Sequence, residues 1–123
     1  MIALRAPWVA YKVNFVHVDV GEIEMAIMNL RVGGWRRCSV GTWSSAGGTW
    51  FAMTGLVVSK FGGVGWAGKR ENPLGDQREI ATCAGKSMRL LDSGLGIALH
   101  SLRLREPFLR WVHDGQTKQF RLR

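Results

Sequence analysis

The residues best suited to ligand chemistry form a glycine-rich run with two cations at its end, GVGWAGKR over residues 63–70. This run matches G-x-G-x-x-G and G-x-x-x-x-G-K, patterns of loops whose backbone N–H groups approach phosphate oxygens. Arg70 occupies the place of a metal-binding hydroxyl, and Pro73 prevents the helix that would follow. The sequence predicts an exposed basic loop over residues 62–70 that contacts phosphate without hydrolysing a nucleotide. The simplest alternative is a surface loop without a ligand, because such short patterns recur by chance.

Tryptophans lie beside cations at several points of the chain, as in Trp35-Arg36-Arg37 and Arg110-Trp111. Aromatic rings stack on bases and cations follow phosphates, which is the combination that single-stranded nucleic acid requires. Tryptophan also fills cores, so we expect about four of the six tryptophans to be mainly buried. Trp66, inside the predicted glycine-rich loop, is the best candidate for exposure.

Positive charge is concentrated in two blocks of the chain. The 123 residues contain 17 Lys and Arg against 9 Asp and Glu, a net charge of +8. Residues 31–70 carry six cations and no acid, and residues 93–123 have a net charge of +4. Such a field attracts phosphate backbones, acidic protein surfaces or anionic lipid. Most of the cations are arginines, which favour forked contacts with phosphate or carboxylate.

Other kinds of reactive site are not apparent from the residue spacing. His17, His100 and His113 are far apart, and no Cys, Asp or Glu stands at metal-ligand spacing around them. No serine has the G-x-S-x-G context of a nucleophile. We therefore expect no metal, no cofactor and no enzyme activity, although scattered residues can still assemble a site.

The two cysteines and the chain's apolar segments bear on its environment. Cys38 and Cys83 form no C-x-x-C pattern, which favours two buried free thiols over a disulfide. The first residues have no signal-peptide pattern, and an intracellular location is favoured. Residues 38–59 are uncharged and long enough for a membrane helix, but 4 Gly, 4 Ser and 3 Thr favour strands instead.

The first half of the chain reads mainly as strands. Residues 8–20 alternate like one long strand with a bulge near Phe15. Residues 21–32 fit a helix that ends at Gly33-Gly34, although their alternation also fits a strand. Residues 35–66 indicate two strands joined by a Gly/Ser turn.

The second half combines a predicted helix with more strands. Residues 62–76 have the composition of a loop, and residues 77–92 place apolar side chains at helical spacing behind a capping Asp76. Residues 95–105 alternate, and residues 107–123 predict a hairpin whose Asp114-Gly115 pair suits a type I′ turn. The chain is thus predicted to be one α+β domain over residues 1–123, a mostly antiparallel curved sheet or small barrel with one or two helices packed on it.

These observations favour a basic nucleic-acid-binding module, such as a small RNA-binding or ribonucleoprotein component whose partner is RNA or single-stranded DNA. One alternative is an accessory subunit that docks on an acidic protein surface. Another is a small-ligand-binding domain or enzyme with a cleft between the sheet and the predicted 77–92 helix; a membrane partner is not favoured. The predicted nucleic-acid-binding residues are Arg36, Arg37, Trp66, Lys69, Arg70, Arg103 and Arg105.

Overall fold

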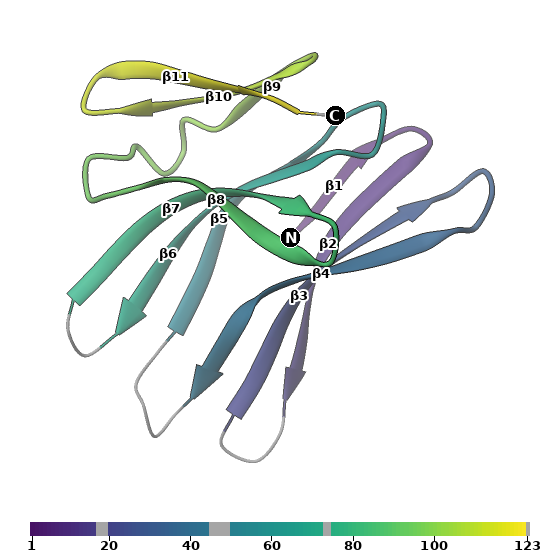
Figure 1. The fold of residues 1–123 in the computed structure, drawn as a ribbon, viewed down its shortest axis with the longest axis horizontal. Coiled ribbons are helices and arrows are strands. Elements are labelled where there is room, and N and C mark those ends of the chain that lie inside the picture. Colours follow the sequence, from purple (N-terminus) through teal and green to yellow (C-terminus); the bar gives the residue numbers. More distant parts are fainter. Residues whose placement is uncertain (17–19, 45–49, 73–74, 123) are drawn as a thin grey trace.

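The protein is built of β-strands, as the computed structural model shows for residues 1–16, 20–44, 50–72 and 75–122 (Figure 1). The prediction of an α+β fold is wrong, because no helix occurs among these residues. The strands are β1 (Ile2–Arg5), β2 (Trp8–Val16), β3 (Val20–Asn29), β4 (Trp35–Ser44), β5 (Trp50–Val58), β6 (Val64–Asn72), β7 (Gly75–Ala84), β8 (Ser87–Ser93), β9 (Arg103–Arg105), β10 (Phe108–His113) and β11 (Gln116–Arg121).

Eight of the strands form one curved sheet made of two consecutive meanders. Strands β1 to β4 pair in order, and so do β5 to β8, with every pair antiparallel. The meanders join where β4 runs parallel to β8, at the Ser39 and Ser87 pair. The two edge strands, β1 and β5, lie close to each other, so the sheet is nearly closed into a barrel.

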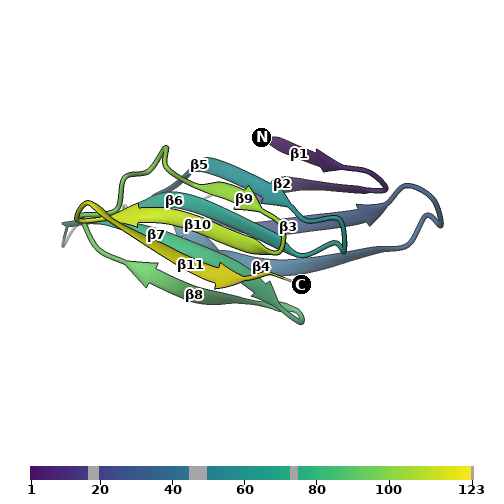
Figure 2. The same cartoon turned by 90° about the horizontal axis from the view of Figure 1, so that it is seen from above.

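The last three strands form a separate sheet in the order β11-β10-β9, which lies across the outside of the barrel (Figure 2). Its inner face contributes Leu109 and Trp111 to a core shared with Ala67 and Ile80 of the barrel wall. Several barrel strands are therefore covered on both faces, by the barrel interior and by the small sheet.

The barrel interior is filled by apolar side chains and crossed by a disulfide. Trp66 and Met25 are among its largest fully buried members. Cys38 on β4 is bonded to Cys83 on β7, with 5.9 Å between their Cα atoms. The prediction of two free thiols is therefore wrong. Sequence spacing did not show that a nearly closed sheet brings these two strands together.

The glycine-rich run is strand β6 and not an exposed loop. Gly65 faces the small sheet, where an added Cβ would lie 2.7 Å from a methyl carbon of Leu109. Gly68 faces the interior, where an added Cβ would overlap the Phe51 ring. These glycines therefore permit close packing on the two faces of one strand, which accounts for the spacing that resembled a phosphate-binding loop.

Each of the two predicted helices contains a strand segment that is buried on both faces, Met25–Ile27 in β3 and Glu79–Thr82 in β7. In β3, Met25, Ala26 and Ile27 are all buried although they are consecutive. Residues 77–92 form β7 and β8 instead of a helix, joined at the two-residue turn Gly85-Lys86. Burial on both faces removes the alternation of polar and apolar residues that marks a half-exposed strand.

Two predictions about strand pairing also need correction. Residues 8–20 are not one strand, because β2 ends at Val16 and Val20 begins its antiparallel partner β3; residues 17–19 lie outside the described residues. Strands β4 and β5 both form, but they do not pair with each other.

Among the described residues there is no helix with the length and apolarity to cross a membrane. Within residues 38–59, the described parts are mainly β4 and β5.

The C-terminal hairpin is confirmed. Strands β10 and β11 pair from Phe108–Arg121 to His113–Gln116, which leaves Asp114 and Gly115 as a two-residue turn. Both turn residues have positive φ angles, 50° and 76°. A type I′ turn requires this geometry, and Asp-Gly adopts it readily.

We expect Gly68→Ala to lower the free energy of unfolding by about 1–3 kcal/mol, because the added methyl group overpacks the interior against Phe51. Gly34→Ala is the matched control, since its Cβ would meet only Val32 at 3.9 Å; its effect should stay within about 0.5 kcal/mol. Urea denaturation followed by tryptophan fluorescence measures both. Equal stability of the Gly68→Ala variant and the wild type would show that this glycine is not required for packing.

We expect the double change Cys38→Ala/Cys83→Ala to lower the free energy of unfolding by about 2–4 kcal/mol, because the disulfide closes a large loop of the unfolded chain. Wild-type protein in reductant should approach the stability of this variant. Reductant should leave the variant itself unchanged, which controls for other effects of the reagent. A reductant-insensitive wild type would contradict the presence of the bond in solution.

Candidate functional site

A basic groove lies where the two meanders meet, beside the C-terminal end of β11. Its volume is about 840 Å³. One wall comes from the start of β4, another from the β7–β8 hairpin, and the third from residues 120–122. Its principal polar and aromatic lining residues are Glu24, Trp35, Arg36, Arg37, Lys86, Arg89, Phe120 and Arg121.

The charge of the groove is strongly positive, with five cations and one acid in its lining. The acid, Glu24, lies 3.6 Å from the Arg37 guanidinium. Within the described part of the chain, no carboxylate lies within ion-pair distance of Lys86, Arg89 or Arg121. These three side chains therefore keep a positive field that a bound anion could neutralise.

Aromatic rings stand next to the cations of the groove. The Trp35 side chain is 53% exposed, and the Arg37 guanidinium lies 4.3 Å from its ring centre. On the opposite wall, the Arg89 guanidinium lies 5.3 Å from the centre of the Phe120 ring. Both contacts lie in the range of cation–π attraction, which holds the arginines over the rings.

The walls of the groove are fastened to each other at their base. The Ser39 N–H donates a 3.0 Å hydrogen bond to the Lys86 carbonyl oxygen. The Cys38–Cys83 disulfide joins the same two segments from the barrel interior. Arg36 is also fixed, because its guanidinium donates a 2.6 Å hydrogen bond to the Gly62 carbonyl oxygen. The cations are therefore presented on a preorganised frame.

Arg36 and Arg37 are the two predicted site residues that lie in this groove. Arg70 lies elsewhere and is largely inside the barrel, where it forms a forked ion pair with the buried Glu79 at 3.0 and 3.2 Å. It also donates to the Val40 carbonyl oxygen. Its guanidinium is thus engaged in structural contacts.

Lys69 is paired with two acids near the end of the β6–β7 hairpin. Its ammonium lies 2.7 Å from Glu71 and 3.6 Å from Asp76. The hydrogen bond and charge of Glu71, followed by the charge of Asp76, raise the pKa of Lys69 above its ordinary value. The local field around Lys69 is therefore neutralised, although the sequence suggested a basic end to a loop.

Trp66 is completely buried among the interior side chains, with 0% of its surface exposed. The expectation that it is the most exposed tryptophan is wrong. In this conformation no base can reach its ring. Trp35 and Trp50 are the more exposed tryptophans of the described residues, and Trp35 is the one that lines the groove.

Arg103 and Arg105 lie together on β9, in the small sheet and outside the groove. Sequence reasoning missed Lys86, Arg89 and Arg121. The first two fell in a predicted helix, which gave no sign that they lie opposite β4. Their position at a hairpin turn opposite β4 depends on long-range pairing. The one local signal was Gly85, which weakened the helix and now has a φ of 65° at that turn.

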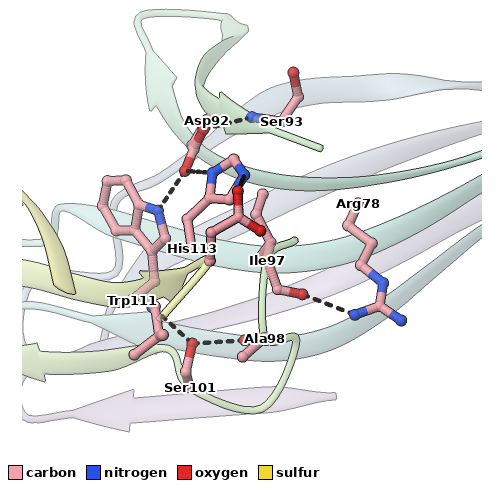
Figure 3. A network of polar contacts seen from close by, with 10 residues as sticks. Arg78, Asp92, Ser93, Ile97, Ala98, Ser101, Trp111 and His113 are labelled. Atoms are coloured by element: carbon pink, nitrogen blue, oxygen red, sulfur yellow. Dashed lines mark hydrogen bonds and ion pairs between the residues drawn. The ribbon is translucent and has the colours of Figure 1, made fainter. Parts of the chain in front are cut away.

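A second polar cluster connects the small sheet to β8 (Figure 3). The Asp92 carboxylate accepts hydrogen bonds from the Trp111 indole at 2.7 Å and from Nδ1 of His113 at 2.8 Å. Desolvation raises the pKa of Asp92, but the hydrogen bonds from Trp111 and His113 and the charge of His113 outweigh it, so the pKa lies below its ordinary value of 3.8.

In the Asp92 cluster an acid orients a histidine, but no hydrogen bond joins a described hydroxyl or thiol to that histidine. The Ser101 hydroxyl donates to the Ala98 carbonyl oxygen and accepts from the Val112 N–H instead. The described residues contain no group of three metal-ligating side chains; His17 lies outside them. The proposed cleft between a sheet and a 77–92 helix is also absent there, because those residues are strands. The cluster therefore serves to fasten the two sheets.

No protein-family model, curated protein or solved structure matches the chain.

We expect Asp92→Asn to make the protein less stable near neutral pH and to reduce the loss of stability in acid. A carboxylate with a lowered pKa in the folded state stabilises the fold above its ordinary pKa and loses that contribution as the pH falls through the folded value. The difference in free energy of unfolding between wild type and variant, called the gap below, should therefore narrow below about pH 4, as the Asp92 carboxylate becomes protonated. Denaturant midpoints at several pH values measure the gap. A gap that stays constant down to pH 3 would contradict this role of the Asp92 charge.

Proposed function

We propose that this protein is a nucleic-acid-binding module that holds RNA or single-stranded DNA in the basic groove. The observation that supports it best is the combination, in one groove, of five cations with the exposed Trp35 ring. Cations attract phosphates without regard to sequence, and an exposed ring can stack on any base.

The distribution of acids supports an anionic ligand at this place. Glu71 and Asp76 contact Lys69, and Glu79 contacts Arg70, all away from the groove. Glu106 contacts Arg5 at 3.8 Å. The described acids thus largely contact cations outside the groove, whereas Arg36, Lys86, Arg89 and Arg121 line it without an ion pair to a described acid.

Each component of the groove has a specific role in this proposal. Lys86 and Arg89 contact phosphates, because they project from the hairpin without an acidic partner among the described residues. Arg37 holds the Trp35 ring from one side and leaves its remaining surface for a base. Arg36, fixed to the Gly62 carbonyl, contributes charge from an ordered position.

We expect Lys86→Ala/Arg89→Ala to weaken binding of a labelled oligouridylate and to flatten the slope of log affinity against log salt by about 1–2 units, since each phosphate contact on a single strand contributes about 0.7. Trp35→Leu should weaken binding at least about fivefold with a smaller change of slope, because it removes stacking and no charge. Fluorescence anisotropy across a salt series measures both quantities.

Arg31→Ala/Lys60→Ala is the charge-matched control, because both side chains are exposed and neither lines the groove. This control should lower affinity much less than the groove variant. If wild-type protein shows no affinity for RNA or single-stranded DNA at low salt, the proposed function is wrong. If the control and the groove variant behave alike, binding is not located in the groove.

A further inference from the structure

The outer face of the small sheet carries four arginines around one aromatic ring. Leu109 and Trp111 of β10 point toward the barrel, so Phe108 and Arg110 face the opposite way. Residues directly opposite each other on paired strands share a face. The pairing of β10 with β9 and β11 therefore places Arg103, Arg105 and Arg121 on the face of Phe108 and Arg110.

The register arranges these residues in two rows across the strands. The first row is Arg105–Phe108–Arg121, with the ring between two arginines. The second row is Arg103–Arg110–Gln119. Arg103, Arg105 and Arg110 also line a small depression of about 170 Å³. This surface, formed by Arg103, Arg105, Phe108, Arg110 and Arg121, is called the arginine face below.

The positive charge of the arginine face is not neutralised by carboxylates of the described residues. In the described part of the chain, the guanidinium groups of these arginines make no ion pair. Arg103 stands directly opposite Arg110, and like charges in that position destabilise a sheet. No carboxylate of the described residues offsets this repulsion through an ion pair, whereas an anionic partner would use the free guanidinium donors.

We propose that the arginine face is a second binding surface, on which a single-stranded nucleic acid stacks a base on Phe108 and places its phosphates against the surrounding arginines. The ring favours nucleic acid over an acidic protein, because stacking requires a planar partner between the cations. It favours a single strand over a duplex, because the bases of a duplex are already stacked on one another.

The arginine face adjoins the groove, since Arg121 belongs to both. A strand held in the groove can therefore continue across the small sheet. This inference rests on the proposed function and extends it, because it gives the ligand a path over two surfaces. It predicts that a long oligonucleotide binds more tightly than one that covers the groove alone.

The test compares variants of the two surfaces on labelled oligothymidylates of about 8 and 20 nucleotides. Arg103→Ala/Arg105→Ala should flatten the salt slope for the longer probe by about 1–1.5 units, from two lost phosphate contacts. Phe108→Leu should weaken binding of the longer probe at least about fivefold, and Phe108→Tyr should retain the wild-type affinity because the ring remains. The shorter probe should respond mainly to Lys86→Ala/Arg89→Ala.

Denaturation curves identify any variant that fails to fold, including Phe108→Leu if it is unstable. In that case the arginine double variant carries the result. If the groove variant loses affinity while the arginine-face variants bind like the wild type, the second surface is wrong and the proposed function remains. If wild-type protein binds neither probe, both fail.

Two further outcomes would overturn the inference even if the arginines of this face contribute to binding. Equal weakening of duplex and single-stranded binding by Phe108→Leu would exclude stacking on an unpaired base. Polyglutamate can be tested as a competitor of the labelled longer oligonucleotide. If it competes as strongly as the unlabelled longer oligonucleotide, and this competition requires Arg103 and Arg105, the arginine face belongs to an acidic protein partner. The control variant Arg31→Ala/Lys60→Ala, whose side chains line neither the groove nor the depression of the arginine face, should show neither effect.

Discussion

The fold depends on the junction between its two meanders. Each meander can form from neighbouring strands alone, but the barrel requires β4 to meet the β7–β8 hairpin. That junction has one parallel pair at Ser39 and Ser87, a hydrogen bond to Lys86, and the disulfide inside the barrel. Because the ladder there is so short, the covalent bond supplies the constraint that a longer row of hydrogen bonds supplies elsewhere.

The candidate site is a consequence of the same junction. Where two strands separate after a short pairing, the surface between them opens, and the groove lies at this opening. Trp35, Arg36 and Arg37 reach it from the first meander, and Lys86 and Arg89 reach it from the second. Cations about fifty positions apart in the sequence thus contribute to the positive electrostatic potential of one groove. The disulfide fixes the distance between their strands.

The sequence predicted local features well where one face of a strand is exposed. The β10–β11 hairpin combined clear alternation with an Asp-Gly turn, and it was predicted correctly. The helix predictions failed at β3 and β7, whose central residues are buried on both faces, and the loop prediction failed at β6, whose glycines pack closely on both faces. The small sheet covers the outer face of β6 and β7, and a single sequence gives no direct sign of that sheet.

The candidate site could be predicted only in part for a related reason. Arg36 and Arg37 were found because they adjoin a tryptophan and lie in a block without acids. Lys69 and Arg70 belong to the same block, but Glu71 follows Lys69 on β6, and the pairing of β6 with β7 brings Asp76 and Glu79 to them. The net charge of a sequence segment therefore did not give the net charge around its residues in the folded protein. The acids that neutralise a cation were as important as the cations themselves.

The placement of β6 has a consequence for motion within the protein. This strand pairs with β5 on one side and β7 on the other, faces the barrel interior with Trp66, and faces the small sheet with Ala67. Local opening cannot expose its amides unless both sheets separate. The Trp66 and Ala67 amide hydrogens should therefore exchange with solvent only through complete unfolding, while β11 at the edge of the small sheet exchanges through smaller openings. Within the described part of the chain, we therefore expect slow exchange in the glycine-rich run whose composition first suggested a loop.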